Sequence, residues 1–299
     1  MATVDVIIPS YNGAKYLPFA LDSVLAQSFD DWRILVVDDG STDHTPEVIA
    51  PYLDRLGAKI RYIKQENQGI SAARNTAIKA ATAEFLAFLD ADDVWLPCRL
   101  SDSLELLRRR PEIGLTYGGI TLIDAAGQPG QTFTGSKKNM ATRIGPQIYC
   151  RDIHIPCVTV TVRRQCITEA GAFDESMRVT EDRDLWFRIV QRYDAGFIPK
   201  ALAYYRVSPD SMTTDPERML EAQLRFIHRY YGSQGCGLGR RQLALSRAYV
   251  ECAQTYAKKR RPWKALGNSL KAVALLPFSK ENLRAAGSIL FRTATRGRR

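Results

Sequence analysis

The sequence predicts an α/β protein with a Rossmann-like, mostly parallel sheet flanked by helices, followed by a helical, basic C-terminal region. Two observations lead to this prediction. Short apolar runs alternate with stretches of helical apolar spacing through residues 4–93, as in β-α-β units. From residue 216 onward the pattern becomes helical and the charge strongly positive. We therefore expect two regions, residues 1–215 and 216–299.

The β-α-β units come first. The expected strands are "VDVIIPSYN", "WRILVVDD", "KIRYIKQE" and "EFLAFLDADD". The expected helices are "AKYLPFALDSVLAQSF", one that begins near Thr45, and the alanine-rich "GISAARNTAIKAAT". The carboxyl ends of parallel strands share one edge of the sheet, and ligands bind beyond it. The polar residues that follow these strands are Tyr11, Asp38, Asp39, Asp90 and Asp92.

The pattern between residues 99 and 215 is mixed. The expected strands are "GLTYGGITLID", "CVTVTVRR" and "AGFIPKALAYYRV", with a polar loop at 124–146. The stretch "EDRDLWFRIVQRY" predicts a helix with an acidic first turn, which the helix dipole favours.

The composition is that of an ordinary globular protein, with 45% hydrophobic and 25% charged residues among 299. The six cysteines form no C-x-x-C pair, which argues against a zinc site and favours buried, reduced thiols. The three histidines do not cluster in sequence, and we expect structural positions for them. The N-terminal residues lack signal-peptide features, and no apolar stretch approaches the ~20 residues that span a bilayer. We therefore expect a catalytic machinery that faces the cytoplasm.

The net charge of +10 is unevenly distributed. Residues 216–299 contain 18 Lys and Arg against 4 Asp and Glu, a net +14, whereas residues 1–215 carry −4. This asymmetry indicates a polyanionic partner such as anionic lipid, nucleic acid or an acidic polymer. Nucleic acid is the less favoured of these, because the region lacks a basic stripe interleaved with aromatic residues.

Three carboxylates crowd the end of one expected strand. Asp90, Asp92 and Asp93 follow the apolar run "FLAFL". Such a cluster is costly at the end of a buried strand unless a cation or hydrogen-bond donors offset the repulsion. The sequence therefore predicts a cation here, and an acidic helix cap is the alternative.

Seven ordered motifs carry a family resemblance over roughly residues 4–215. They are "VIIPSYN", "VVDDGSTD", "NQGISAARN", "FLDADD", "GAFDE", "EDRDLWFR" and "YYRVSPDS". Together they resemble family 2 glycosyltransferases, the inverting nucleotide-sugar enzymes of the GT-A fold. The resemblance implies that residues 1–215 form a GT-A catalytic domain.

The resemblance implies a metal–diphosphate site at "FLDADD", a D-x-D motif. Asp92 matches the metal ligand, and Asp90 matches the residue beside the ribose and the metal. Ala91 lies between them on the donor side, and Asp93 is expected to support the ligands. The implied cofactor is Mg²⁺ or Mn²⁺, hard cations that favour carboxylate and phosphate oxygens.

The resemblance also places donor-binding residues at the strand ends. Tyr11 is expected to stack on the base, with the backbone around Pro9 beside it. Asp39 is expected to accept a hydrogen bond from a base N–H, which suits uracil or thymine. Arg74 matches an arginine that approaches the base or the diphosphate. The alternative for Tyr11 is packing on a loop, that for Asp39 is capping of a helix, and that for Arg74 is a surface salt bridge. For Asp38, a structural position is favoured.

The motif "EDRDLW" is implied to supply the catalytic base. Asp182 matches the carboxylate that takes a proton from the acceptor hydroxyl, and its alternative is an ordinary acid at a helix N-terminus. Glu181 is expected to orient a loop or the acceptor. Asp184 is expected to cap or brace the helix. Trp186 is expected either to support an acceptor sugar or to pack in the core.

The motif "YYRVSPDSMT" resembles a loop that closes over the donor. Its residues expected to bind the diphosphate are Arg206, Ser208 and Ser211. Many relatives have His where this chain has Ser208, so the resemblance does not carry over a third metal contact. The Q-x-x-R-W motif of processive relatives is missing from the sequence, which favours transfer of a single sugar.

The implied activity is inverting transfer of one sugar from a UDP- or dTDP-sugar to an acceptor hydroxyl. The expected acceptor is a glycan or a lipid-linked sugar, in synthesis of cell-surface polysaccharide, lipopolysaccharide or glycolipid. An anionic membrane surface is the further partner expected for the basic region, at the inner membrane face. The alternatives are a catalytically weak nucleotide-sugar-binding protein and, less favoured, a nucleic-acid-binding protein.

Overall fold

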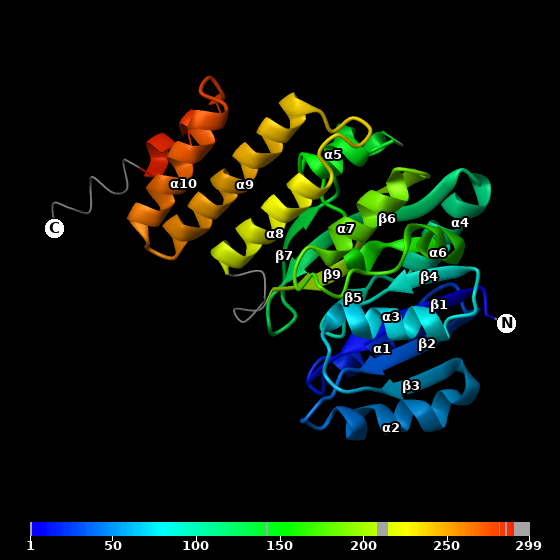
Figure 1. The fold of residues 1–299 in the computed structure, drawn as a ribbon. Helices are drawn as coiled ribbons and strands as arrows, with labels where there is room; N and C mark the ends of the chain where they lie inside the picture. The colour runs from blue at the N-terminus through cyan, green and yellow to red at the C-terminus, as the bar shows by residue number, and fades with distance from the viewer. Residues whose placement is uncertain (1, 142, 208–214, 281, 285, 290–299) are drawn as a thin grey trace. The chain divides into compact units, whose positions relative to one another are not determined.

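The computed structural model describes residues 2–289 apart from 142, 208–214, 281 and 285 (Figure 1). The chain divides into two compact units. The first contains Met1–Ile144 and His154–Ser208, and the second contains Gly145–Ile153 and Pro209–Arg299. The short segment at 145–153 thus belongs with the helical unit, which the sequence pattern did not indicate.

The first unit begins with a parallel half-sheet in the order β3-β2-β1-β4. In its register Ile7 lies beside Leu35 on one side and Phe88 on the other. The strands are β1 (Val4–Ser10), β2 (Trp32–Asp38), β3 (Ile60–Lys64) and β4 (Phe85–Phe88). The helices between them are α1 (Leu17–Leu25), α2 (Thr45–Leu56) and α3 (Ile70–Ala80), with a 3₁₀ turn η1 (Gly57–Lys59) after α2. These elements match the predicted β-α-β units.

The rest of the sheet mixes strand directions. β8 (Thr161–Arg163) runs antiparallel to β4 and to β6 (Ile113–Ile123). β9 (Asp194–Arg206) runs parallel to β6. The hairpin strand β7 (Pro129–Phe133) pairs with β6, and β5 (Val94–Trp95) pairs with β9, both antiparallel. The expectation of a mostly parallel sheet therefore holds for the first half only, because a hairpin and short returning strands build the second half.

The core lies where the strands and helices of this unit meet. Every residue of β1 is buried, as expected for a central parallel strand. α1 packs Leu17, Leu21 and Val24 on the sheet, at the spacing that predicted the helix. α3 buries Ala72, Ala73 and Ala77, small residues that let the helix approach closely. The remaining elements are α4 (Arg99–Arg109), η2 (Lys137–Met140), η3 (Cys157–Thr159), α6 (Arg164–Ala170) and α7 (Glu181–Val190).

The second unit is helical, as predicted for the C-terminal region. α8 begins with a side-chain cap, because Asp215 Oδ1 accepts a hydrogen bond from the Glu217 backbone N–H at 3.0 Å. A small apolar cluster, which includes Tyr256 and Ala265, holds the helices together. The helices are α5 (Gly145–Tyr149), α8 (Pro216–Arg229), α9 (Leu238–Lys258) and α10 (Pro262–Leu275). Within the described residues, no helix has the length and apolar character needed to cross a bilayer.

Candidate active site

The carboxyl ends of β1, β2 and β4 bring several predicted residues to one edge of the sheet. Tyr11 follows Ser10, the last residue of β1, and its ring is exposed. Pro9 is buried in β1 beside Val37 of β2. Asp90 and Ala91 follow β4 and are half-buried. Because the strands are parallel, these residues share the edge where ligands bind in such sheets.

Arg74 connects two of the motifs. This residue of α3 is only 2% exposed. Its Nη2 lies 2.7 Å from Asp90 Oδ1, and its Nη1 lies 2.8 Å from Glu181 Oε1. Burial would lower the pKa of Arg74, but the charges of Asp90 and Glu181 raise it well above its ordinary value. Arg74 is therefore a buried ion pair and not a surface salt bridge, and it joins the end of β4 to the start of α7.

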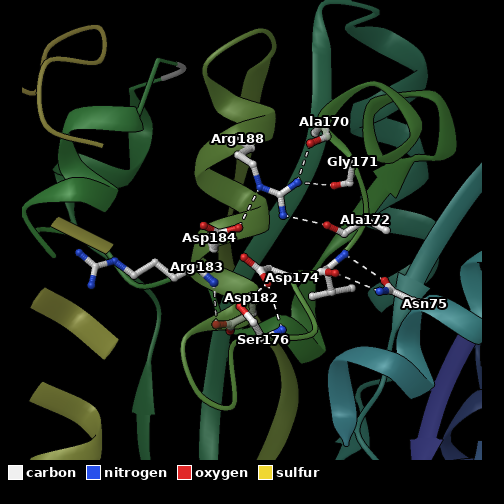
Figure 2. A network of polar contacts seen from close by, with 11 residues as sticks. Asn75, Ala170, Gly171, Ala172, Asp174, Ser176, Asp182, Arg183, Asp184 and Arg188 are labelled. Atoms are coloured by element: carbon white, nitrogen blue, oxygen red, sulfur yellow. Dashed lines mark hydrogen bonds and ion pairs between the residues drawn. The ribbon is translucent and has the colours of Figure 1, made fainter. Parts of the chain in front are cut away.

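The first turn of α7 holds the candidate base. Asp182 is half-buried, and one of its carboxylate oxygens accepts a hydrogen bond from the Arg183 backbone N–H at 2.6 Å (Figure 2). Burial raises the pKa of Asp182, against the opposing charge of Arg74. Burial likewise raises the pKa of Glu181, again opposed by Arg74. A carboxylate with a raised pKa is a better proton acceptor near neutral pH.

Within the acidic cluster after β4, Asp90 is paired with Arg74, whereas Asp92 and Asp93 form no ion pair among the described residues. Burial, and then the charge of Asp90, raises the pKa of Asp92 to about 6. Burial and the charges of Asp92 and Asp90 raise the pKa of Asp93 well above its ordinary value. Asp93 accepts one hydrogen bond, from the Arg206 backbone N–H at 2.8 Å. Its other oxygen is buried and has no hydrogen-bond partner among the described residues. Added positive charge would relieve this repulsion.

Asp90 and Asp92 fit a hard divalent cation. Among the residues that the structure describes, no group of three or more His, Cys, Asp or Glu side chains could hold a metal ion by itself. Mg²⁺ and Mn²⁺ sites in nucleotide enzymes often use one or two carboxylates, with substrate phosphates and water completing the shell. Two neighbouring carboxylates, of which Asp90 is paired with Arg74 and Asp92 has a raised pKa, suit that kind of site.

Asp39 holds the loop that leads into α3. It accepts hydrogen bonds from Gln65 Nε2 at 2.7 Å, from the Gln68 backbone N–H at 2.9 Å and from the Gly69 backbone N–H at 2.8 Å. A carboxylate offers about four acceptor positions, so three are occupied within the protein. The contacts of Asp39 in this structure are therefore those of the alternative, an aspartate that binds backbone N–H groups at the start of a helix.

Asp38 has the structural position that the sequence favoured. It accepts hydrogen bonds from the Ser41 backbone N–H and from the Tyr62 hydroxyl. These contacts fix the turn after β2.

Arg206, expected to bind the diphosphate, makes several contacts within the protein. Its Nε donates to the Asp92 carbonyl and its Nη1 to the Asp124 carbonyl, at 2.8 and 2.9 Å. Its guanidinium also lies over the Tyr16 ring, 4.3 Å from the centroid. Arg206 therefore ties the end of β9 to the acidic loop. Ser208 and Ser211 lie outside the described residues.

Trp186 has the core position, which was one of its two expected positions. This side chain is 1% exposed and packs edge-on against Phe88 and Phe173, with ring centroids 5.5 and 6.0 Å apart. Its place on the inner face of α7 makes it a core residue, which was the alternative. The neighbouring Asp184 is buried and forms an ion pair with Arg188 at 2.8 Å, as expected for a brace (Figure 2).

Three hydrogen bonds from two residues of α3 were not predicted. The Asn75 side-chain amide donates to the Phe173 carbonyl, and its oxygen accepts from the Phe173 backbone N–H, both at 2.9 Å. Ser71 Oγ donates to the Met177 carbonyl at 3.3 Å. Together with Arg74, they fasten α3 to the segment before α7. A buried polar face on an alanine-rich helix was the available sequence signal.

The comparison with protein families decides the assignment. The model described as "Glycosyl transferase family 2" matches residues 5–167, more than half of the chain. The chain belongs to this family. An uncharacterized glycosyltransferase of Rickettsia typhi is 32% identical to this chain, and the match includes 71% of this chain. It spans 66% of the relative's own length, just under two thirds.

A second relative carries a specific name. It is the UDP-Glc:alpha-D-GlcNAc-diphosphoundecaprenol beta-1,3-glucosyltransferase WfgD of Escherichia coli, 29% identical over 74% of this chain and 83% of its own. Among solved structures, the mannosyltransferase PcManGT of Pyrobaculum calidifontis, in complex with GDP-Man and Mn²⁺, superposes with a TM-score of 0.66. That match covers 98% of this chain and 86% of the other at 18% identity. It confirms the predicted α/β fold of GT-A type.

Proposed function

We propose that this family 2 glycosyltransferase moves one sugar from a nucleotide-diphosphate sugar to an acceptor hydroxyl with inversion, and that it needs a divalent metal. The observation that carries the proposal is the bridge from Asp90 through Arg74 to Glu181. It connects the carboxylates suited to a metal–diphosphate with the helix turn that bears Asp182. A donor site and a base must be close for direct transfer.

The proposed donor site uses the strand ends. Tyr11 stacks on the nucleobase of the donor, beside the backbone of Pro9. Asp39 offers its remaining acceptor position to an N–H of that nucleobase. A uracil or thymine base suits this acceptor, which favours a UDP- or dTDP-sugar. Asp90 and Asp92 hold Mg²⁺ or Mn²⁺, with Ala91 against the donor. When bound, the cation neutralises the diphosphate charge that grows as the sugar leaves.

The proposed base is Asp182. It takes the proton of the acceptor hydroxyl as the oxygen attacks the anomeric carbon on the face opposite the diphosphate, so the new bond has the inverted configuration. Burial disfavours the ionised form of the Asp182 carboxylate and strengthens it as a base. Glu181, fixed by Arg74, holds the first turn of α7 in place.

The proposed acceptor is a glycan or a lipid-linked sugar of a cell-surface polymer. Support comes from WfgD, whose name specifies a UDP-sugar donor and a diphosphoundecaprenol-linked acceptor. The 29% identity of that relative supports this class of acceptor without fixing the sugar or the linkage.

A panel of nucleotide sugars tests the donor assignment. Thermal shifts measured with and without Mn²⁺ should show one uridine or thymidine donor that stabilises the protein only when the metal is present. Equal shifts for all bases, or no effect of the metal, would contradict the donor site. Slow hydrolysis of the selected donor would distinguish an enzyme from a protein that only binds nucleotide sugars.

A further inference from the structure

Helix α10 has an inner face made of small residues. Ala265, Ser269 and Ala272 are buried, at a spacing that places them on one side of the helix. This side packs on α9 within the second unit. Small side chains let two helices approach closely. The inner face is therefore fully used by the unit itself.

The opposite face of α10 is apolar and uncovered. Trp263 is 76% exposed and Leu270 is 57% exposed, and the exposed Gly267 and Ala274 continue the same row. At about 100° per residue, this row lies roughly opposite the buried row. Phe278, 93% exposed, follows the end of the helix. A soluble helix usually presents polar residues on its outer face, so this row needs a partner.

A cluster of cations precedes the helix that carries the uncovered row. Lys258, Lys259, Arg260 and Arg261 directly precede α10, and all four are exposed. In the described part of the chain, none of them forms a salt bridge with an acidic side chain. Residues 252–299 contain 12 Lys and Arg and a single acidic residue, Glu281. The surroundings of the row therefore favour a polyanionic partner.

We infer that the outer face of α10 and the cations before it bind an anionic lipid surface. Tryptophan prefers the boundary between headgroups and acyl chains, and a leucine on the same face adds apolar burial. Lysine and arginine beside that face are attracted to anionic headgroups. A second copy of the chain fits less well, since a paired α10 face would bring two cationic clusters together. Nucleic acid would use the cations but would leave the Trp263–Leu270 row without an apolar environment.

This inference concerns binding and stands independently of the proposed sugar transfer. The experiment therefore measures adsorption of the full chain to vesicles, without nucleotide or metal. Vesicles of phosphatidylcholine alone are compared with vesicles that also contain phosphatidylglycerol, at low and high salt.

Two variants separate the apolar and charged contributions. Trp263→Ser with Leu270→Ser removes the apolar row, and Lys258→Gln, Lys259→Gln and Arg261→Gln removes three cations. Matched controls change exposed residues of the first unit. They are Phe19→Ser for the apolar variant and Arg55→Gln, Lys79→Gln and Arg109→Gln for the charge variant. Circular dichroism of each variant verifies that the helices form.

We expect the wild type to sediment with the anionic vesicles only, and less at high salt. The charge variant should lose about 100-fold in partitioning and the apolar variant about tenfold or more, with both controls unchanged. Equal binding to neutral vesicles, or loss in the charge variant alone, would overturn the inference. A wild-type dimer in light scattering that the apolar variant abolishes, without vesicle binding, would instead assign the face to a second copy.

Discussion

Arg74 Nη1 lies 2.8 Å from Glu181 Oε1, an ion pair between residues 107 positions apart in the chain. The same guanidinium contacts Asp90 at 2.7 Å. A buried arginine therefore fixes the distance between the acidic loop after β4 and the first turn of α7. Donor chemistry and proton transfer depend on two separate motifs, and this contact sets their relative position.

Replacing Arg74 by methionine should strongly destabilise the protein. The change keeps much of the side-chain volume but leaves Glu181 and Asp90 without their shared cation. Breaking a buried pair in this way costs about 3–5 kcal/mol. Urea denaturation measures the loss in free energy of unfolding. Arg74→Lys, which keeps the charge but can serve only one carboxylate well, should lose less, and an equal loss in both variants would argue against the bridge.

Removing the Asp92 carboxylate should abolish metal-dependent binding of UDP. Asp92→Asn keeps the shape of the side chain and removes one of the two proposed anionic ligands. Titration calorimetry with UDP, in the presence of Mn²⁺ or of EDTA, measures the effect. The wild type should bind more tightly with Mn²⁺, whereas the variant should bind equally under both conditions. An unchanged metal effect in the variant would remove Asp92 from the metal site.

The free energy of unfolding of the metal-free protein should depend on pH through Asp92. Its pKa is raised from 3.8 to about 6 in the folded state, so folding favours its protonated form. Its contribution to stability is therefore present below about pH 4 and is lost as the pH rises through about 6. Relative to Asp92→Asn, the wild type should lose on the order of 2–3 kcal/mol across this range. If the difference in free energy of unfolding between the wild type and Asp92→Asn, measured in EDTA, were the same at every pH, the raised pKa would be contradicted.

Trp186 should matter for stability and not for binding of UDP. Trp186→Ala leaves a cavity against Phe88 and Phe173, which should cost about 3–5 kcal/mol. The exposed Tyr11→Ala is the matched aromatic control and should cost far less in stability while weakening UDP binding. Denaturation and calorimetry on both variants measure the two effects. A Trp186 variant that unfolds like the wild type would contradict the core assignment.

Much of this fold could be predicted from local patterns. The buried runs of β1, β2 and β4 and the spacing of α1 and α3 are determined by which residues must leave water, and they appear directly in the sequence. The mixed half of the sheet could not be predicted in the same way. The directions of β6, β8 and β9 depend on how a hairpin and short returning strands pair, which is a non-local property.

The site was predicted in part, for a similar reason. Strand ends placed Tyr11 and Asp90 at one edge, because strand direction alone determines that position. The true contacts of Arg206 and Trp186 depend on their orientation toward carbonyls and aromatic rings from distant segments. A motif specifies that a residue is present, but only the packed structure specifies what it touches.

The central claim is that Asp182 is the base next to a separate donor site. The most direct test compares Asp182→Asn with the wild type, using the donor selected by the nucleotide-sugar panel and Mn²⁺. The account predicts that donor affinity from calorimetry stays within a few-fold, while the rate of donor hydrolysis, and of transfer once an acceptor is in hand, falls about 10²–10⁴-fold. A variant that turns over within a few-fold of the wild type would contradict the account and assign the base to another residue.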